Sequence, residues 1–155
     1  MFNPQTLQTL TVKYIIENDI PFQVLPNLIH QDINTLLQIR QFREEEEELS
    51  QKIEILCDKK DECEFNAIGF EVIAYNSKVT SEKQQLIEKS EFFFHLVYKI
   101  GALVEEYEKK IENLEEEEGF LIATLPHQYR NMDIKLKELS NYDETKHKLM
   151  EILDL

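Results

Sequence analysis

The chain has 155 residues, of which 42% are hydrophobic, and its 31 acidic and 17 basic residues leave a net charge of −14. The apolar content supports a folded core and argues against general disorder. So acidic a chain repels phosphate backbones and anionic membranes, and we expect neither nucleic acid nor a membrane as its partner.

The backbone composition points to helices. Only 3 Gly and 4 Pro occur, and the longer segments lack the alternating pattern of β-branched residues that strands show. We therefore expect an all-α chain. No basic-then-apolar leader opens it, and no apolar stretch approaches the roughly 20 residues of a membrane span, so we expect a cytoplasmic or nuclear protein.

Residues 1–43 predict a helix, an apolar elbow and a second helix. Asn3 and Pro4 suit the start of the first helix, and Asn18 suits a left-handed residue at its end. We expect the elbow, 19–26, to pack on other parts of the chain because it is too apolar for a solvated loop. The apolar residues of the first helix share one face and are candidates for partner binding: Leu7, Leu10, Tyr14 and Ile15.

A short motif lies on this helix: Thr6-Leu7, followed at intervals of four residues by Thr11 and Ile15. It resembles the elongin-C-binding box of SOCS-box-type ubiquitin ligase adapters, with Thr11 where that family usually has Cys. The resemblance implies an apolar helix that inserts into a groove of elongin C.

In the same family a following Leu-Pro segment contacts the cullin, and Leu25-Pro26 lies roughly at that place. The stretch 25–37 also resembles the opening of an F-box, which binds a Skp-family adaptor. The alternative for the whole segment 6–37 is an ordinary core, because Leu and Ile at helical spacing mostly pack inside a protein.

Residues 35–64 continue the helical pattern. Their apolar residues recur at spacings of three and four, although the position near Glu46 is vacant. The pattern leaves open whether 27–60 is one helix or two. The acidic run Glu44 to Glu48 is either a docking strip for a basic partner or a solvated helical face, and we favour the solvated face.

Cys57 and Cys63 are a weak metal motif, because two thiolates need further ligands and none stands nearby at zinc-site spacing. We expect free thiols and no bound zinc. Residues 65–80 have the most β-like composition of the chain, and we expect a partly helical connector whose aromatic residues close the end of a helix pair.

Residues 81–118 form the longest helical pattern, and Gly119 suits its end. Its apolar stripe requires another helix along it, from this chain or from a partner. Gly101, inside the stripe, suggests a close helix approach. Four residues of the stripe are further candidates for partner binding: Phe93, Ile100, Leu103 and Tyr107.

The last third predicts a helix capped by Asn131 and a final helix that opens with Asn141 and Glu144, as in a capping box. Because the chain ends on apolar residues, we expect the final helix to dock. No phosphate-binding glycine loop, nucleophile motif or paired histidines appear, so we expect no enzyme and no cofactor.

These patterns together predict an elongated all-α bundle: short N-terminal helices in 1–43, and an acidic hairpin in 44–155 that is built on a long, coiled-coil-like antiparallel pair. The function expected is a structural or scaffold subunit that binds protein partners, as a homo- or hetero-oligomer, through its long apolar seam. The alternative is a ubiquitin ligase adapter that recruits elongin C or a Skp-family adaptor through 6–37.

Overall fold

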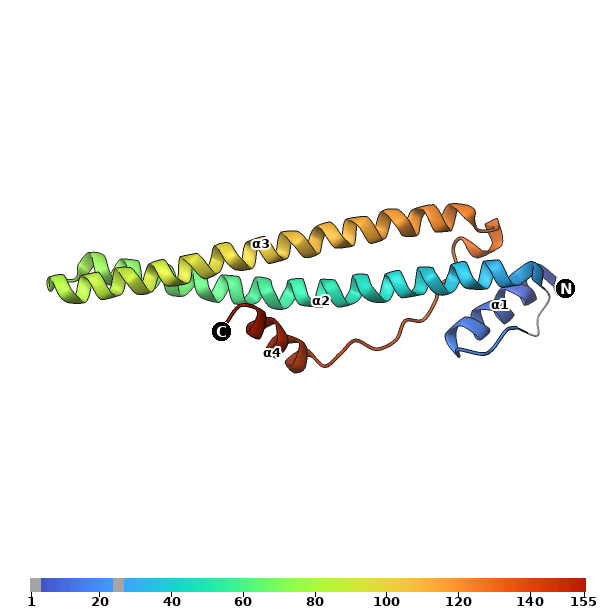
Figure 1. The fold of residues 1–155 in the computed structure, drawn as a ribbon, viewed down its shortest axis with the longest axis horizontal. Coiled ribbons are helices and arrows are strands. Elements are labelled where there is room, and N and C mark those ends of the chain that lie inside the picture. Colours follow the sequence, from blue (N-terminus) through green and yellow to red (C-terminus); the bar gives the residue numbers. More distant parts are fainter. Residues whose placement is uncertain (1–3, 24–26) are drawn as a thin grey trace. The chain divides into compact units, whose positions relative to one another are not determined.

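The computed structural model describes residues 4–23 and 27–155, with the backbone alone at 4–6 and 27–28. Within these ranges it contains helices and no strand, which confirms the all-α prediction. The helices are α1 (Pro4–Glu17), α2 (Asn27–Asn76), α3 (Thr80–Thr124), the short 3₁₀ turn η1 (His127–Tyr129) and α4 (Tyr142–Ile152) (Figure 1).

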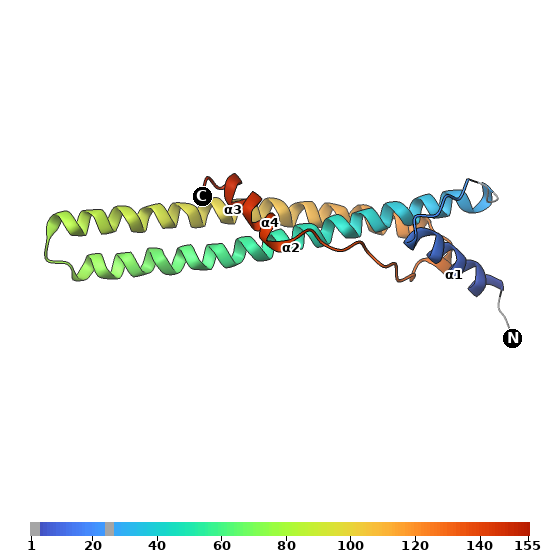
Figure 2. The ribbon, with the colours of Figure 1, turned by 90° about the horizontal axis from the view of Figure 1, so that it is seen from below.

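The two long helices α2 and α3 pack against each other as a hairpin joined by the turn at 77–79 (Figure 2). The apolar stripe of α3 is therefore covered by the chain itself. The connector expected at 65–80 is shorter than predicted, because α2 stays helical to Asn76. Of its aromatic residues, Phe70 stacks on Phe93 of α3 with ring centroids 5.8 Å apart, whereas Phe65 and Tyr75 are exposed. Residues 65–76 are helical despite their β-like composition, because the helix buries Ala67 and Ala74 against the rest of unit 2. The Ser90 Oγ of α3 also donates a hydrogen bond of 2.8 Å to the Ala67 carbonyl.

Two expectations about glycine in α3 are also wrong. Gly119 does not end the helix, which continues to Thr124 because Leu121 and Ile122 pack on an apolar core. Gly101 marks no close approach, since a Cβ atom placed there would meet nothing within 4 Å.

The contacts divide the chain into two units, and the division passes through both long helices. Unit 1 comprises Met1–Glu48 and Ile111–Leu139. The half-buried Ile20 and Phe22 of the elbow pack on its core, as expected from their apolar character. That core consists of Val12, Ile15, Ile16, Ile33, Leu36, Ile39, Leu125, Tyr129, Met132 and Ile134.

Unit 2 comprises Leu49–Lys110 and Ser140–Leu155. Asn141 caps α4, its Oδ1 accepting a hydrogen bond of 2.9 Å from the Asp143 amide. Leu149 and Leu153 are buried against α2 and α3, so the final helix docks as predicted. The core of unit 2 consists of Ile55, Leu56, Cys63, Leu96, Ile100, Tyr107, Leu149 and Leu153.

The helix expected after Asn131 is absent: residues 132–141 have no regular secondary structure and follow an extended course (Figure 1). Met132 and Ile134 are buried with an exposed residue between them, which is the period of two of an extended chain. The amides of Lys135 and Lys137 donate to carboxylates of other segments, so they are not available for helical hydrogen bonds.

Candidate functional site

Helix α1 has two apolar faces, and only one of them is used inside unit 1. Val12, Ile15 and Ile16 are at most 8% exposed and belong to the core. The second face, which we call the outer face, consists of Leu7, Leu10 and Tyr14, which are 49, 56 and 61% exposed. The helix is therefore more apolar than its own packing requires.

The outer face is a stripe, because residues at i, i+3 and i+7 lie on one side of a helix. Thr11 lies beside it, and its hydroxyl donates a hydrogen bond of 2.9 Å to the Leu7 carbonyl. That bond satisfies the hydroxyl within the helix. Lys13 and Glu17 are the only charged residues of α1, and they pair at 3.9 Å, so the outer face is apolar on a helix without net charge.

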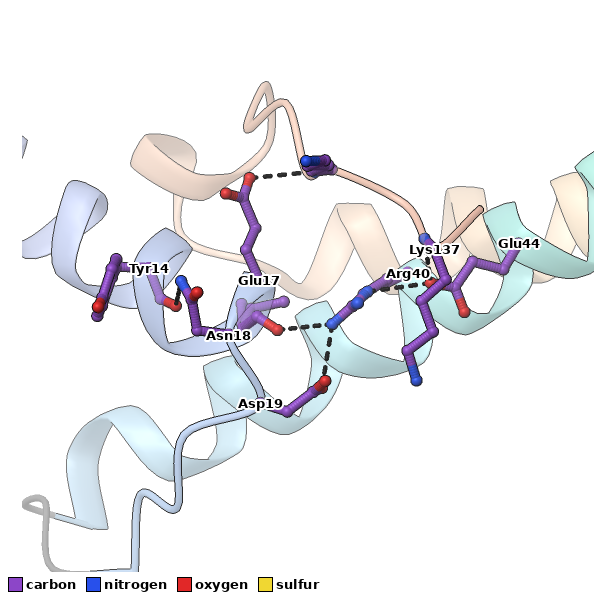
Figure 3. Close-up of polar contacts among 9 residues, drawn as sticks. Tyr14, Glu17, Asn18, Asp19, Arg40, Glu44 and Lys137 are labelled. Atoms are coloured by element: carbon purple, nitrogen blue, oxygen red, sulfur yellow. Dashed lines mark hydrogen bonds and ion pairs between the residues drawn. The ribbon is translucent and has the colours of Figure 1, made fainter. Parts of the chain in front are cut away.

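Arg40 of α2 holds the C-terminal end of α1. Its guanidinium is almost fully buried and donates to the Ile16 carbonyl at 2.6 Å and to the Asp19 carboxylate at 3.2 Å (Figure 3). Its Nε donates to Glu44 at 3.1 Å. A buried guanidinium needs such partners to offset its desolvation. These contacts fix the inner side of α1 while leaving the outer face bare.

The extended segment after η1 closes the same region. Glu17 of α1 accepts a hydrogen bond of 3.1 Å from the Lys135 amide, and Glu44 accepts one of 3.0 Å from the Lys137 amide (Figure 3). Glu44 thus serves both Arg40 and the extended segment. The acidic run from Glu44 to Glu48 was expected to be a solvated helical face. Its first residue instead takes part in contacts within unit 1.

The end of α1 differs in detail from the expectation. The left-handed residue is Asp19, at a φ of 51°, and not Asn18. Asn18 instead donates its side-chain amide to the Tyr14 carbonyl at 2.9 Å (Figure 3). The Ile20 amide reaches back to the Ile15 carbonyl, as in a Schellman motif. The chain then turns back towards α2.

The eight predicted partner-binding residues that the structure describes belong to different surfaces and cores. Leu7, Leu10 and Tyr14 form the outer face, whereas Ile15 lies in the core of unit 1. Leu25 and Pro26 fall outside the described residues. The four residues of the α3 stripe belong to the core of unit 2, where two of them are buried and two are half-buried: Phe93, Ile100, Leu103 and Tyr107.

A carboxylate pair in unit 1 was missed by the sequence analysis. Burial, followed by the nearby Glu118 and Glu115, raises the pKa of Glu46 to about 7. One oxygen of Glu46 is buried without a hydrogen-bond partner, while Glu118 accepts from Arg43 at 2.7 Å. A proton on Glu46 would supply the missing donor towards Glu118. The sequence did contain a sign of this pair: Glu46 stands where the helical spacing of 35–64 calls for an apolar residue, which indicates a carboxylate on the packed side of the helix.

The surroundings of Cys63 do not favour a thiolate. Cys63 is fully buried, and burial raises the pKa of its thiol, which disfavours the thiolate that metals bind. Among the described residues, no group of three or more His, Cys, Asp or Glu is placed to hold a metal ion. None of the helices in the described part of the chain has the length and hydropathy of a membrane span.

Comparisons with protein-family models, curated proteins and solved structures find no match to this chain. The outer face of α1 is the feature from which a function is best argued.

Proposed function

We propose that this chain is a non-enzymatic subunit of a multi-protein assembly and that it docks on a protein partner through the outer face of α1. The observation that supports this proposal is that α1 has a second, exposed apolar face in addition to the one buried in unit 1. Single exposed apolar residues are common on protein surfaces, but Leu7, Leu10 and Tyr14 follow one another along a single stripe.

The partner chemistry follows from the charge of the helix. Because Lys13 and Glu17 neutralise each other, a partner needs no complementary charge at the outer face. An apolar groove that receives one side of a helix is the recognition mode that fits. The sequence analysis expected partners to bind along the apolar seam of the long helices. The proposal does not use that seam, because α2, α3 and α4 cover it within the chain.

A narrower candidate is a ubiquitin ligase adapter that recruits elongin C. Two positions of the motif that resembles the elongin-C-binding box, Leu7 and Thr11, lie on the exposed side of α1. Ile15, the third position, packs inside unit 1 and would have to act by holding the helix in place. The Skp-family alternative has less support, because Ile33 and Leu36 of the F-box-like stretch are core residues.

Affinity purification of the full chain from its own cells tests the wider proposal. Leu7→Glu and Tyr14→Ala should each reduce recovery of the main partner by about tenfold or more, as truncation of a central interface residue does. Gln8→Glu is the matched control, because it adds the same charge to an exposed position on another side of α1. All variants should keep the circular dichroism spectrum and melting temperature of the parent chain.

If the partners of the Leu7→Glu and Tyr14→Ala chains match those of the parent, the outer face is not the docking site. The narrower candidate is tested separately by titration calorimetry with purified elongin B/C and with a Skp-family adaptor. Binding to elongin B/C that Leu7→Glu abolishes supports the adapter. Absence of heat with both proteins eliminates the adapter and leaves the wider proposal standing.

A further inference from the structure

Unit 2 has an apolar surface that its own packing does not use, on α2 close to the turn at 77–79. The residues of this surface, which we call the α2 stripe, recur at intervals of three, four and three residues. They are Phe65, Ile68, Val72 and Tyr75, and they are 79, 50, 55 and 84% exposed. In helical geometry they lie on a different side of α2 from the buried Ala67 and Ala74. The stripe is thus separate from the core of unit 2.

A glycine borders the α2 stripe. Gly69 follows Phe65 by four residues and precedes Val72 by three, so the three share one side of the helix. A Cβ atom at Gly69 would meet nothing within 4 Å. Glycine weakens a helix interior relative to alanine, and the packing of this chain does not require one here. A partner backbone could approach closely at this point.

On α2 itself the charges around the stripe are all negative, and on α3 one cation, Lys83, lies beside Glu71 and Tyr75. From Asp61 to Asn76 the sequence contains no Lys or Arg. Four exposed carboxylates occur in this span: Asp61, Glu62, Glu64 and Glu71. Glu62 pairs with Lys59 at 3.0 Å, and in the described part of the chain no ion pair neutralises the other three. The stripe therefore attracts a cationic partner.

This charge also argues against other occupants. A symmetric pair of copies would bring two sets of the same carboxylates together. An anionic membrane surface would be repelled in the same way. A hollow of about 360 Å³ adjoins the stripe at Glu71 and Tyr75, with Ile87 and Phe94 of α3 among its lining residues. It is large enough to receive a bulky apolar side chain.

We propose that the α2 stripe docks a basic amphipathic helix of a partner protein. The apolar side of that helix packs on Phe65, Ile68, Val72 and Tyr75, and its Lys and Arg residues face the bordering carboxylates. This partner differs in chemistry from the one that fits the uncharged α1. The chain would then join two proteins, one at each unit.

The test uses the full chain and a fluorescent peptide of about 18 residues, built from Leu and Lys as an amphipathic helix. A second peptide has Glu in place of Lys and the same Leu pattern. Fluorescence anisotropy at about 0.15 M salt should show binding of the Lys peptide alone. The double change Phe65→Ser/Val72→Ser should weaken it by about tenfold or more.

Three further variants locate the peptide. Tyr98→Ser, at an equally exposed aromatic residue of α3, should leave the affinity within about twofold. Glu116→Gln/Glu117→Gln removes exposed charge elsewhere and should have an equally small effect. Gly69→Leu should weaken binding without lowering the melting temperature, because its side chain enters open space in the free chain.

The proposal is overturned if the Lys peptide does not bind, or if the stripe variants bind it as well as the parent chain does. It is overturned equally if sedimentation shows that the chain self-associates and that Phe65→Ser/Val72→Ser abolishes the association. That result would assign the stripe to a second copy of this chain. None of these outcomes bears on the outer face of α1, which lies in unit 1.

Discussion

Units 1 and 2 bury their apolar residues by different means. In unit 1 an extended segment without helix of its own lies against the helices, held by carboxylates that accept its Lys135 and Lys137 amides. In unit 2 the added segment is the helix α4, which packs through Leu149 and Leu153. Directional polar contacts therefore add to the burial of Met132 and Ile134 in the first arrangement, whereas apolar burial on helix surfaces fixes the second.

The difference has a physical cause. The backbone amides of an extended segment have no partner within the segment, so their acceptors come from other segments or from water. Glu17 and Glu44 supply them, and Arg40 offsets the negative charge of Glu44. A helix satisfies its own backbone, so α4 needs only an apolar stripe. Unit 1 should accordingly be sensitive to charge and pH, and unit 2 to the volume of its side chains.

The largest expected effect is in unit 2. Ile100 is fully buried, and Ile100→Ala removes apolar contacts and leaves a cavity. We expect a loss of about 2–5 kcal/mol in the free energy of unfolding, measured by urea denaturation. Tyr98→Ala, two residues away and 79% exposed, should change it by less than about 0.5 kcal/mol. Equal losses in the two variants would contradict the buried seam.

The next effect is in unit 1. Arg40→Ala removes the guanidinium donor from the Ile16 carbonyl and from the Glu44 carboxylate, and hydrogen bonds to charged groups contribute about 1.5–3 kcal/mol. We expect a loss of this size, with faster amide exchange in α1 and in residues 132–139. Lys109→Ala, which breaks only an exposed pair with Glu105, should cost less than about 1 kcal/mol. Unchanged exchange in α1 would show that Arg40 does not hold it.

A smaller effect depends on pH. The pKa of Glu46 in the folded chain, about 7, exceeds its ordinary value of 4.5 because of burial and the neighbouring carboxylates. The folded chain then keeps a proton that the unfolded chain loses, so stability falls as pH rises between about 4.5 and 7. Glu46→Gln should raise the melting temperature above pH 7 and change it little near pH 5.

Glu47→Gln is the matched control for this pH effect, because Glu47 lies on the same run and is exposed. It should shift the melting temperature by a similar small amount at every pH. A gain from Glu46→Gln that is independent of pH would mean that Glu46 is ionised throughout this range and that the pair with Glu118 holds no proton.

The smallest effect compares the units directly, because each has a helical glycine with open space around it. Gly101→Ala in unit 2 and Gly119→Ala in unit 1 should each stabilise the chain by about 0.5–1 kcal/mol. Urea midpoints are sufficient to measure the change. If Gly119→Ala destabilises the chain instead, unit 1 requires the backbone flexibility of a glycine at residue 119.

The sequence was most informative where one helical period runs without interruption. The spacing along 81–118 predicted α3 and its buried Ile100 and Tyr107, because periodic apolar residues must be covered. It was least informative at 65–76, where a β-like composition became helix, and at 132–141, where a helical pattern became extended. Contacts with segments distant in the sequence decided both stretches, and local propensity does not contain them.

The candidate site shows the same division. The sequence alone determined that α1 carries Leu7, Leu10, Tyr14 and Ile15, since helical spacing depends only on their order. Only the tertiary structure decided which of them face outwards, because that depends on where Arg40 and the segment 132–139 hold the helix. The α2 stripe was likewise visible as apolar residues, but its exposure follows from the pairing of the opposite side of α2 with α3. Composition and period depend on neighbours along the chain, whereas exposure depends on contacts between residues far apart in it.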